Sequence, residues 1–384
     1  MKVLYFSKTS IPSRTANSLH VMKMCQAFSK NGHDVWFCAL SEIIQKQLPT
    51  KEIFRFYGVK ECFHILRIPV FRDKGKKNRF LWSHFFIIPY LLNVLRKVKP
   101  DIVYGRDIFS CYIAACFGYP VVAESHFPLW YGKIASFAFE RLHKHKNFKR
   151  LVVISEALKK EYLLHYSDLT TSQVVVAHDG ADPVESNQLC KQEIGTSGTL
   201  KVGYMGHLYE GKGLEVIAAI ASKIPDIEFH IIGGLDDDIQ KWKKRIDADN
   251  VTFHGFVQQG TLPGYLKALD ICLLPNQYKV LAHGADRSSN IKNISLYTSP
   301  LKMFEYMAHG KAIVASDLPV LREVLNEDIA ILVKPDDYPG WIAAINLLRD
   351  EVLRNNLGRR AKSLFLKEYT WGRRAVSVLD GLER

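Results

Sequence analysis

The sequence predicts an α/β protein with two parallel-sheet domains. Short, wholly apolar runs recur along the 384 residues, and helical patterns separate them. Apolar runs of this length are typical of strands that a parallel sheet buries on both faces. A stretch rich in turn-forming residues, 182–198, interrupts the pattern before it restarts, which indicates a linker. The composition, 47% hydrophobic and 24% charged, excludes a disordered or fibrous chain.

The predicted elements repeat in the two halves. In the first half we expect strands at 3–7, 33–39, 102–104, 121–123 and 151–154, and a helix at 17–30 that Asn31-Gly32 ends. In the second half we expect strands at 202–205, 228–232, 251–254, 271–274 and 312–315, and helices at 214–223, 262–269 and 300–309. This gives Rossmann-like domains at 1–181 and 199–368, with a ligand cleft at the carboxyl ends of their strands. The last helix, in 369–384, has an apolar side that predicts packing back on the first domain.

Cysteine usage and hydropathy predict a cytoplasmic protein. The seven cysteines are scattered without a CxxC pair, which fits a reducing compartment and argues against a disulfide framework or a zinc site. The opening apolar run, 1–6, is too short for a signal peptide. The longest apolar stretch, 80–95, falls short of the roughly 20 residues that span a bilayer.

Positive charge is concentrated in the first half of the chain. Residues 1–178 hold 27 Lys and Arg against 12 Asp and Glu, whereas residues 179–384 hold 25 against 27. Basic residues that lead into Phe80 and Trp82 suit an anionic membrane surface, so we expect peripheral attachment at the inner membrane face. A solvated basic loop is the alternative, and no nucleic acid is expected because no binding motif for it is present. The two basic clusters are Arg72, Lys74, Lys76, Lys77 and Arg79, and Arg141, Lys144, Lys146, Lys149 and Arg150.

The segment 299–316 is the strongest candidate for a binding site. Pro300 at a helix start leaves the next backbone amides unpaired, and the amides around Ser299, Leu301 and Lys302 form an anion site together with the helix dipole. Glu305, one to two turns further on, could accept hydrogen bonds from a ribose whose diphosphate lies at the helix tip. From the residues alone, an amphipathic helix with an ordinary surface glutamate is equally compatible.

A second candidate is the glycine-rich turn in 202–213. Its glycines let the backbone approach a phosphate, and Lys212 supplies a positive charge before the next helix. The alternative is a plain strand–turn–helix with a solvated lysine. The acidic run 236–238 invites comparison with a metal site, but it follows Gly233-Gly234 and suits the positive end of a helix, so no metal is expected.

These segments resemble the family 4 glycosyltransferases along nearly the whole chain. That family has the GT-B fold, in which two Rossmann-like domains face each other across a cleft. The resemblance places Glu305 at the second, ribose-binding position of the Glu-x7-Glu motif, with Tyr297 at the first position. The Arg and Lys that clamp the diphosphate in the family correspond to His207 and Lys212 here.

The resemblance implies further contacts. It places Ala16 and Asn17 at the donor phosphate or the acceptor, and His126, which ends Glu124-Ser125-His126, beside the donor sugar. It brings backbone groups of Phe256 and Val257 to the nucleobase. Arg106, which follows the predicted strand 102–104, faces the same cleft and is a weaker candidate for contact with the acceptor. A helix cap at Asn17 and a purely structural His126 are the alternatives.

The resemblance therefore implies a retaining, hexosyltransferase-like enzyme. Its donor would be a UDP- or GDP-sugar, and its acceptor a lipid-linked saccharide in envelope polysaccharide or glycolipid synthesis. Lys212 and the helix amides would stabilise the leaving diphosphate, and His126 would orient the sugar. No further cofactor is required, and the oligomeric state is not predicted. A nucleotide-sugar epimerase of the same fold and a non-catalytic nucleotide-sugar-binding module are the alternatives.

Overall fold

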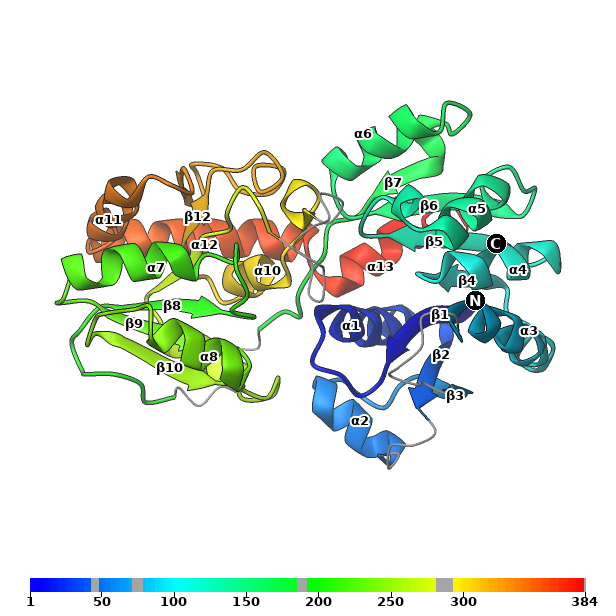
Figure 1. Cartoon of the computed structure of the whole chain (residues 1–384), viewed down its shortest axis with the longest axis horizontal. Helices are drawn as coiled ribbons and strands as arrows, with labels where there is room; N and C mark the ends of the chain where they lie inside the picture. Colours follow the sequence, from blue (N-terminus) through cyan, green and yellow to red (C-terminus); the bar gives the residue numbers. More distant parts are fainter. Residues whose placement is uncertain (43–47, 71–78, 185–191, 281–292, 383–384) are drawn as a thin grey trace. The chain divides into compact units, whose positions relative to one another are not determined.

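The computed structural model describes residues 1–42, 48–70, 79–184, 192–280 and 293–382, and Figure 1 shows its elements. The chain forms two compact units. Unit 1 comprises Met1–His178 and Trp371–Arg384, and unit 2 comprises Asp179–Thr370. The residues expected to form a linker belong to unit 2 where they are described. Ala181 forms a parallel bridge with Thr370, and the Thr196 amide donates to the Glu228 carboxylate at 2.9 Å.

Unit 1 is built on a parallel sheet of seven strands in the order β3-β2-β1-β4-β5-β6-β7. Its strands are β1 (Lys2–Ser10), β2 (Asp34–Glu42), β3 (His64–Val70), β4 (Ile102–Gly105), β5 (Val121–Ser125), β6 (Phe148–Val153) and β7 (Val174–Val176). Its helices are α1 (Ala16–Lys30), α2 (Thr50–Tyr57), α3 (Arg79–Val98), α4 (Ile108–Cys116), α5 (Lys133–Leu142), α6 (Glu156–His165) and α13 (Trp371–Leu379). As predicted, the last helix packs in the first unit, where α13 lies against α1.

Unit 2 repeats the arrangement with six parallel strands in the order β10-β9-β8-β11-β12-β13. Its strands are β8 (Lys201–Met205), β9 (Glu228–Ile232), β10 (Val251–Gly255), β11 (Ile271–Leu274), β12 (Ala312–Ser316) and β13 (Ile331–Val333). Its helices are α7 (Leu214–Ile220), α8 (Asp236–Lys243), α9 (Leu262–Ala268), α10 (Leu301–Ala308), α11 (Tyr338–Leu347) and α12 (Glu351–Glu368). Both sheets reverse their strand order beside the first strand, at β1/β4 and at β8/β11. In open α/β sheets such switch points are where ligands bind.

The predicted α/β class and its parallel sheets are confirmed, because strands lie at every position where an apolar run predicts one. Other elements were not predicted, including β3, β7, β13 and α12. Two details of the prediction are wrong. Thr15, not Asn17, caps α1, since its side chain accepts from the Ser18 amide. Helix α10 begins at Leu301, one residue later than expected, with Pro300 at its N-cap.

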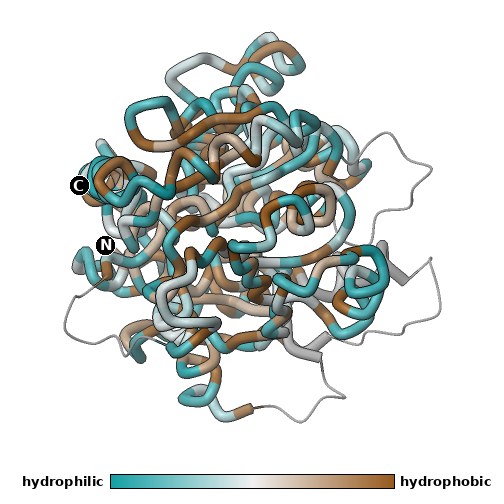
Figure 2. Tube along the Cα trace, turned by 90° about the vertical axis from the view of Figure 1, so that its left-hand side faces the viewer, coloured by the Kyte–Doolittle hydropathy of each residue, from teal (hydrophilic) through white to brown (hydrophobic). Residues whose placement is uncertain are grey.

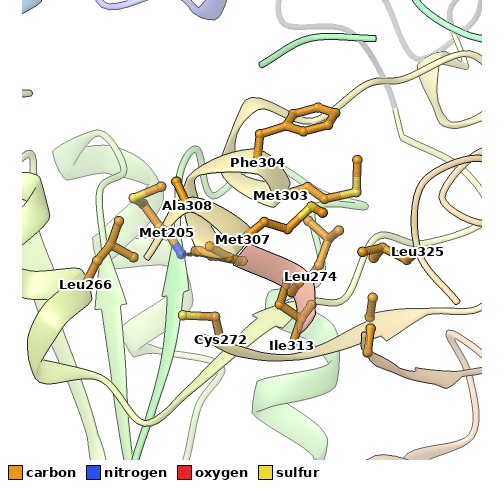
Figure 3. Close-up of a cluster of buried hydrophobic side chains, with 14 of the residues drawn as sticks. Met205, Leu266, Cys272, Leu274, Met303, Phe304, Met307, Ala308, Ile313 and Leu325 are labelled. Atoms are coloured by element: carbon orange, nitrogen blue, oxygen red, sulfur yellow. Dashed lines mark hydrogen bonds between the residues drawn. The ribbon is translucent and has the colours of Figure 1, made fainter. Parts of the chain in front are cut away.

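Strand β11 of unit 2 is wholly apolar, as expected for a strand that helices cover on both faces of the sheet. Along β11, Ile271 and Leu273 pack in one buried cluster, whereas Cys272 and Leu274 pack in the other. Figure 3 shows the second cluster, in which α10 lies over β8, β11 and β12. The Met205 amide of β8 donates to the Tyr306 hydroxyl of α10 at 2.9 Å. This bond and the apolar contacts hold α10 against the sheet.

The helices carry the polar surface of the protein. Hydrophilic and hydrophobic residues alternate along them (Figure 2), as expected for helices that cover a sheet on one side and face water on the other. Within the described ranges, no helix combines the length and the apolar character that a membrane span requires.

Candidate functional site

The switch point of the sheet in unit 2 is formed by the turns after β8 and β11. Gly213 has φ +104°, and a Cβ on it would lie 2.2 Å from the Pro275 oxygen, so only glycine permits this approach. The Gln277 amide donates to the Gly211 oxygen at 2.9 Å. The predicted glycine-rich turn and the turn after β11 therefore form one continuous surface.

Lys302, in the first turn of α10, brings a positive charge to this switch point. Its Nζ lies 3.8 Å from the centre of the Tyr204 ring. This nitrogen is buried and has no hydrogen-bond partner within the described ranges, although the residue as a whole is half-buried. A Cβ on Gly206, which follows β8, would lie 4.0 Å from the same Nζ. Burial holds the pKa of Lys302 well below its usual range, and the charge of Lys212 lowers it further.

Lys212 is the second charge at the switch point. Burial lowers its pKa to about 8, and its Nζ lies 5.2 Å from the centre of the Tyr209 ring. The nearby Glu215 carboxylate accepts instead from the amides of Gly211 and Gly213, at 2.9 and 3.1 Å. In the part of the chain that the structure describes, no carboxylate lies within ion-pair distance of Lys212 or Lys302. Two neighbouring half-buried lysines without an acid are typical of an anion site.

The N-terminus of α10 adds backbone donors beside these lysines. No side-chain hydrogen bond caps the helix at Pro300. Its first amides, those of Leu301 and Lys302, therefore have no capping side chain, as an anion site requires. Ser299 is engaged elsewhere, because its hydroxyl accepts from the Asp179 amide at 2.9 Å.

Glu305 is half-buried and takes part in a hydrogen bond that the sequence did not indicate. Gln259, in the turn after β10, donates to its Oε1 at 3.1 Å. The same turn carries Phe256, which is exposed, and Val257, which packs on the apolar cluster beneath α10. The structure thus brings together the residues predicted to bind a ribose and a nucleobase.

Other polar groups lie at the strand ends of unit 2. Asn276, two residues after the end of β11, is fully buried, and neither polar atom of its side chain has a hydrogen-bond partner in the described residues. His207 accepts the Tyr204 hydroxyl on its backbone oxygen at 2.6 Å, which fixes the turn after β8. Asp236–Asp238 open α8, as predicted from their position.

In unit 1, a carboxylate that the sequence analysis did not emphasise is the centre of the site. Glu124, on β5, is buried and accepts from Arg374 Nη2 at 3.1 Å, His126 Nε2, and the Tyr104 hydroxyl. His20 Nε2 lies 2.9 Å from the same carboxylate. Burial alone would raise the pKa of Glu124. The charges of Arg374 and His20 and the bond from His126 outweigh burial and hold the pKa well below its usual range.

His20, Glu124 and His126 also form a group whose ligand atoms all lie within 4.8 Å of one another, a spacing that could hold a metal ion. The Arg374 guanidinium already lies 3.1 Å from the Glu124 oxygen. A fixed positive charge at this oxygen would repel a metal cation. We therefore describe the group as a hydrogen-bonded network.

The other predicted residues of unit 1 lie around the β1/β4 switch point. Arg106 follows β4, and its Nη1 is buried without a hydrogen-bond partner in the described ranges. Asp107 caps α4 and pairs with Lys8 at 2.9 Å. Ala16 and Asn17, at the start of α1, are exposed.

The two basic clusters differ in what the structure describes. Residues 71–78 of the first cluster lie outside the described residues, and only the backbone is described for Arg79. In the second cluster, Arg141 stacks on the exposed Phe137 ring at 3.6 Å, and Lys144 pairs with Asp168 at 2.9 Å. Arg150 donates to the backbone oxygen of Asp380 at 2.7 Å.

Comparison with known families decides the class. The family described as Glycosyltransferase Family 4 matches residues 18–185, and the family described as Glycosyl transferases group 1 matches residues 199–351. The chain belongs to the family 4 glycosyltransferases. This confirms the glycosyltransferase class that the sequence motifs predicted.

Two curated relatives resemble this glycosyltransferase. A phosphatidyl-myo-inositol mannosyltransferase of Mycolicibacterium smegmatis is 31% identical over 166 residues, which span 42% of this chain and 38% of that protein. The match thus spans well under half the length of that relative. An uncharacterized 41.2 kDa protein in the cps region of Klebsiella pneumoniae is 18% identical over 289 residues, 70% of this chain and 74% of that protein.

Solved structures confirm the GT-B fold. Anabaena Alr3699/HepE, in complex with UDP and glucose, matches with a TM-score of 0.70 and 13% identity over 100% of this chain and 99% of that one. Sucrose-phosphate synthase of Thermosynechococcus elongatus matches with a TM-score of 0.70 and 15% identity over 98% of this chain and 97% of that one.

Proposed function

We propose that this glycosyltransferase uses a nucleotide diphosphate sugar as its donor and retains the configuration at the anomeric carbon. The observation that carries this proposal is the pair of half-buried lysines, Lys212 and Lys302, which have no carboxylate partner in the described residues, with the Lys302 Nζ itself fully buried. A buried, uncompensated charge costs several kcal/mol, and a bound anion offsets that cost. A diphosphate supplies the two or three negative charges that two lysines and the amides of Leu301 and Lys302 can neutralise.

The nucleoside would lie beside the diphosphate, toward Glu305 and the turn after β10. The half-buried carboxylate of Glu305 accepts from Gln259 and can accept further bonds from ribose hydroxyls. Backbone groups of Phe256 and Val257 would meet the base. UDP and UDP-glucose are bound by the Anabaena protein of the same fold, which supports a nucleotide sugar as donor here.

The transfer step breaks the bond between the anomeric carbon and the β-phosphate oxygen, and its electron pair goes to that oxygen. The acceptor hydroxyl oxygen bonds to the anomeric carbon from the same face, and its proton passes to a leaving phosphate oxygen. Lys212, Lys302 and the α10 amides stabilise the charge that develops on the diphosphate. His126 would orient the sugar. The lysines and amides perform this step without a metal ion or further cofactor.

We propose that the acceptor is a lipid-linked saccharide and that the enzyme acts at the cytoplasmic face of an anionic membrane. Arg106, with a buried Nη1 that lacks a partner in the described part, suits a phosphate group of such an acceptor. Exposed Phe137 beneath Arg141 offers the apolar and basic contact that a membrane surface favours. The mycobacterial relative is named for a phosphatidyl-myo-inositol acceptor, which supports a glycolipid or polysaccharide role.

A panel of nucleotide sugars tests the donor assignment. The melting temperature is measured with UDP- and GDP-sugars, with and without a chelator. A ligand at 100 times its Kd adds about 2.7 kcal/mol to the free energy of unfolding. We expect one base to stabilise the chain whether or not the chelator is present. No shift with any member of the panel would contradict the proposal, and donor turnover to an epimer without acceptor would contradict the transferase assignment.

A further inference from the structure

Four side chains from four different elements meet at the Glu124 carboxylate in unit 1. His20 comes from α1, Tyr104 from β4, His126 from the turn after β5, and Arg374 from α13. The side chains of Glu124, His20 and Arg374 are almost fully buried, whereas that of His126 is 15% exposed. His126 is therefore the member of this network that reaches the surface of the unit.

The protonation of the network follows from the charge of Glu124. Its carboxylate is ionised, because Arg374 and the imidazoles hold its pKa well below the usual range despite burial. An ionised carboxylate only accepts hydrogen bonds. His126 Nε2, which is bonded to Glu124 Oε1, must therefore be the donor. A neutral His126 then carries its proton on Nε2 and its lone pair on Nδ1.

Arg374 is itself held firmly. Besides Glu124, its guanidinium donates from Nε to the His178 oxygen at 3.0 Å and from Nη2 to the Ala177 oxygen at 3.2 Å. Its Nη1 also lies 3.3 Å from the Met24 sulfur of α1. It supplies the permanent charge that lets the buried Glu124 stay ionised. The last helix of the chain thereby determines the charge state of a group on β5.

We propose that Glu124 and Arg374 are positioning residues for His126. They hold its imidazole in one orientation and as the Nε2–H tautomer, at the carboxyl end of β5. The role of His126 toward the donor sugar rests on the proposed function, but the tautomer does not. An ion pair that did not act on His126 would stabilise the unit, but the tautomer of His126 would stay the same when Glu124 or Arg374 is replaced.

The test reads the tautomer directly. The full chain is labelled with ¹⁵N-histidine, and the ring nitrogen shifts are recorded without any donor. Loss of a signal in the His126→Gln variant identifies His126 among the 14 histidines. We expect the Nε2–H tautomer in the wild type and a mixture of tautomers in Glu124→Gln. In Arg374→Met the ring shifts of the network histidines should depart from those of the wild type, because the Glu124 charge is no longer balanced. Arg374→Lys, which keeps the charge, should retain the wild-type tautomer, and the Glu124→Gln spectrum alone decides the test if the Met variant does not fold.

Arg373→Met is the matched control, since Arg373 is exposed on the same helix, and its histidine spectrum should match the wild type. Wild-type ring shifts in both Glu124→Gln and Arg374→Met would overturn the proposal. If the nucleotide-sugar panel identifies a donor, Glu124→Gln should lower kcat about 10²-fold with a much smaller change in KM, as expected for a misplaced group. Failure of the panel would contradict the donor assignment and leave the tautomer result standing.

Discussion

The guanidinium of Arg374 lies 3.1 Å from the Glu124 carboxylate, although 250 residues separate the two in the chain. Both side chains are buried, so the pair joins the last helix to the centre of the first sheet. Removing one partner of a buried ion pair leaves the other charge buried without compensation, which typically lowers the free energy of unfolding by about 3–5 kcal/mol. This pair therefore makes unit 1 dependent on the C-terminal segment.

Replacing Arg374 with Met should lower the free energy of unfolding by about 3–5 kcal/mol at pH 7. Urea unfolding at constant m-value measures the loss. The double variant Arg374→Met/Glu124→Gln should recover part of the lost stability, because it leaves no uncompensated charge at this position. Equal stability of the single and double variants would contradict the pairing. In the wild type, the contribution of Glu124 is present above its unfolded pKa and is lost as pH falls through its lowered folded pKa.

Lys212→Met should make the ligand-free protein more stable. The folded-state pKa of Lys212 is about 8, below the usual 10.5, so its buried charge opposes folding at pH 7. Removing it should add about 1–3 kcal/mol, since one pKa unit corresponds to about 1.4 kcal/mol. Between pH 8 and 10.5 the unfolded chain binds more protons than the folded one, so the wild type gains stability as pH rises. The difference in free energy of unfolding between the variant and the wild type should therefore decrease over this pH range, which thermal unfolding measures. A difference that does not change with pH would show that burial does not destabilise the charged form of Lys212.

Glu305→Ala should weaken UDP or GDP binding by about 1.5–3 kcal/mol, the cost of losing hydrogen bonds to a charged group. That is about a tenfold to hundredfold rise in Kd. Gln259→Ala removes only the neighbouring partner at 3.1 Å and should have a smaller effect. Calorimetric titration compares the two, and an unchanged Kd in Glu305→Ala would remove this residue from the nucleotide site.

Neutralising Lys74, Lys76, Lys77 and Arg79 together should release the protein from anionic vesicles, because each basic residue near such a surface contributes about 1 kcal/mol. The matched control neutralises Lys241, Lys243, Lys244 and Arg245, an equal charge exposed in unit 2. Co-sedimentation with vesicles that contain phosphatidylglycerol should fall only in the first variant. Equal loss in both would indicate an effect of net charge, and equal binding to neutral and anionic lipid would contradict a membrane face.

The sequence could predict those features that local pattern determines. Fully apolar runs such as 271–274 predicted the strands, and the glycine and proline positions predicted the start of α7 and, to within one residue, that of α10. It could not predict contacts between distant segments. Arg374 meets Glu124 through the return of α13, and Gln259 meets Glu305 through the packing of α10. The Lys302 side chain was also missed, because only the structure shows that it is buried over the Tyr204 ring without a carboxylate partner in the described residues.

The central claim is that Lys212 and Lys302 hold the diphosphate of the donor. Titration of UDP and GDP into the wild type, Lys212→Met, Lys302→Met and the control Lys223→Met tests it most directly. Lys223 is exposed in unit 2 and follows the C-terminal end of α7, whereas Lys212 precedes the N-terminal end of that helix. We expect the preferred nucleotide to bind the wild type and the control alike, and its Kd to rise about tenfold to hundredfold in each of the other two variants. Wild-type affinity in both Lys212→Met and Lys302→Met would contradict the account.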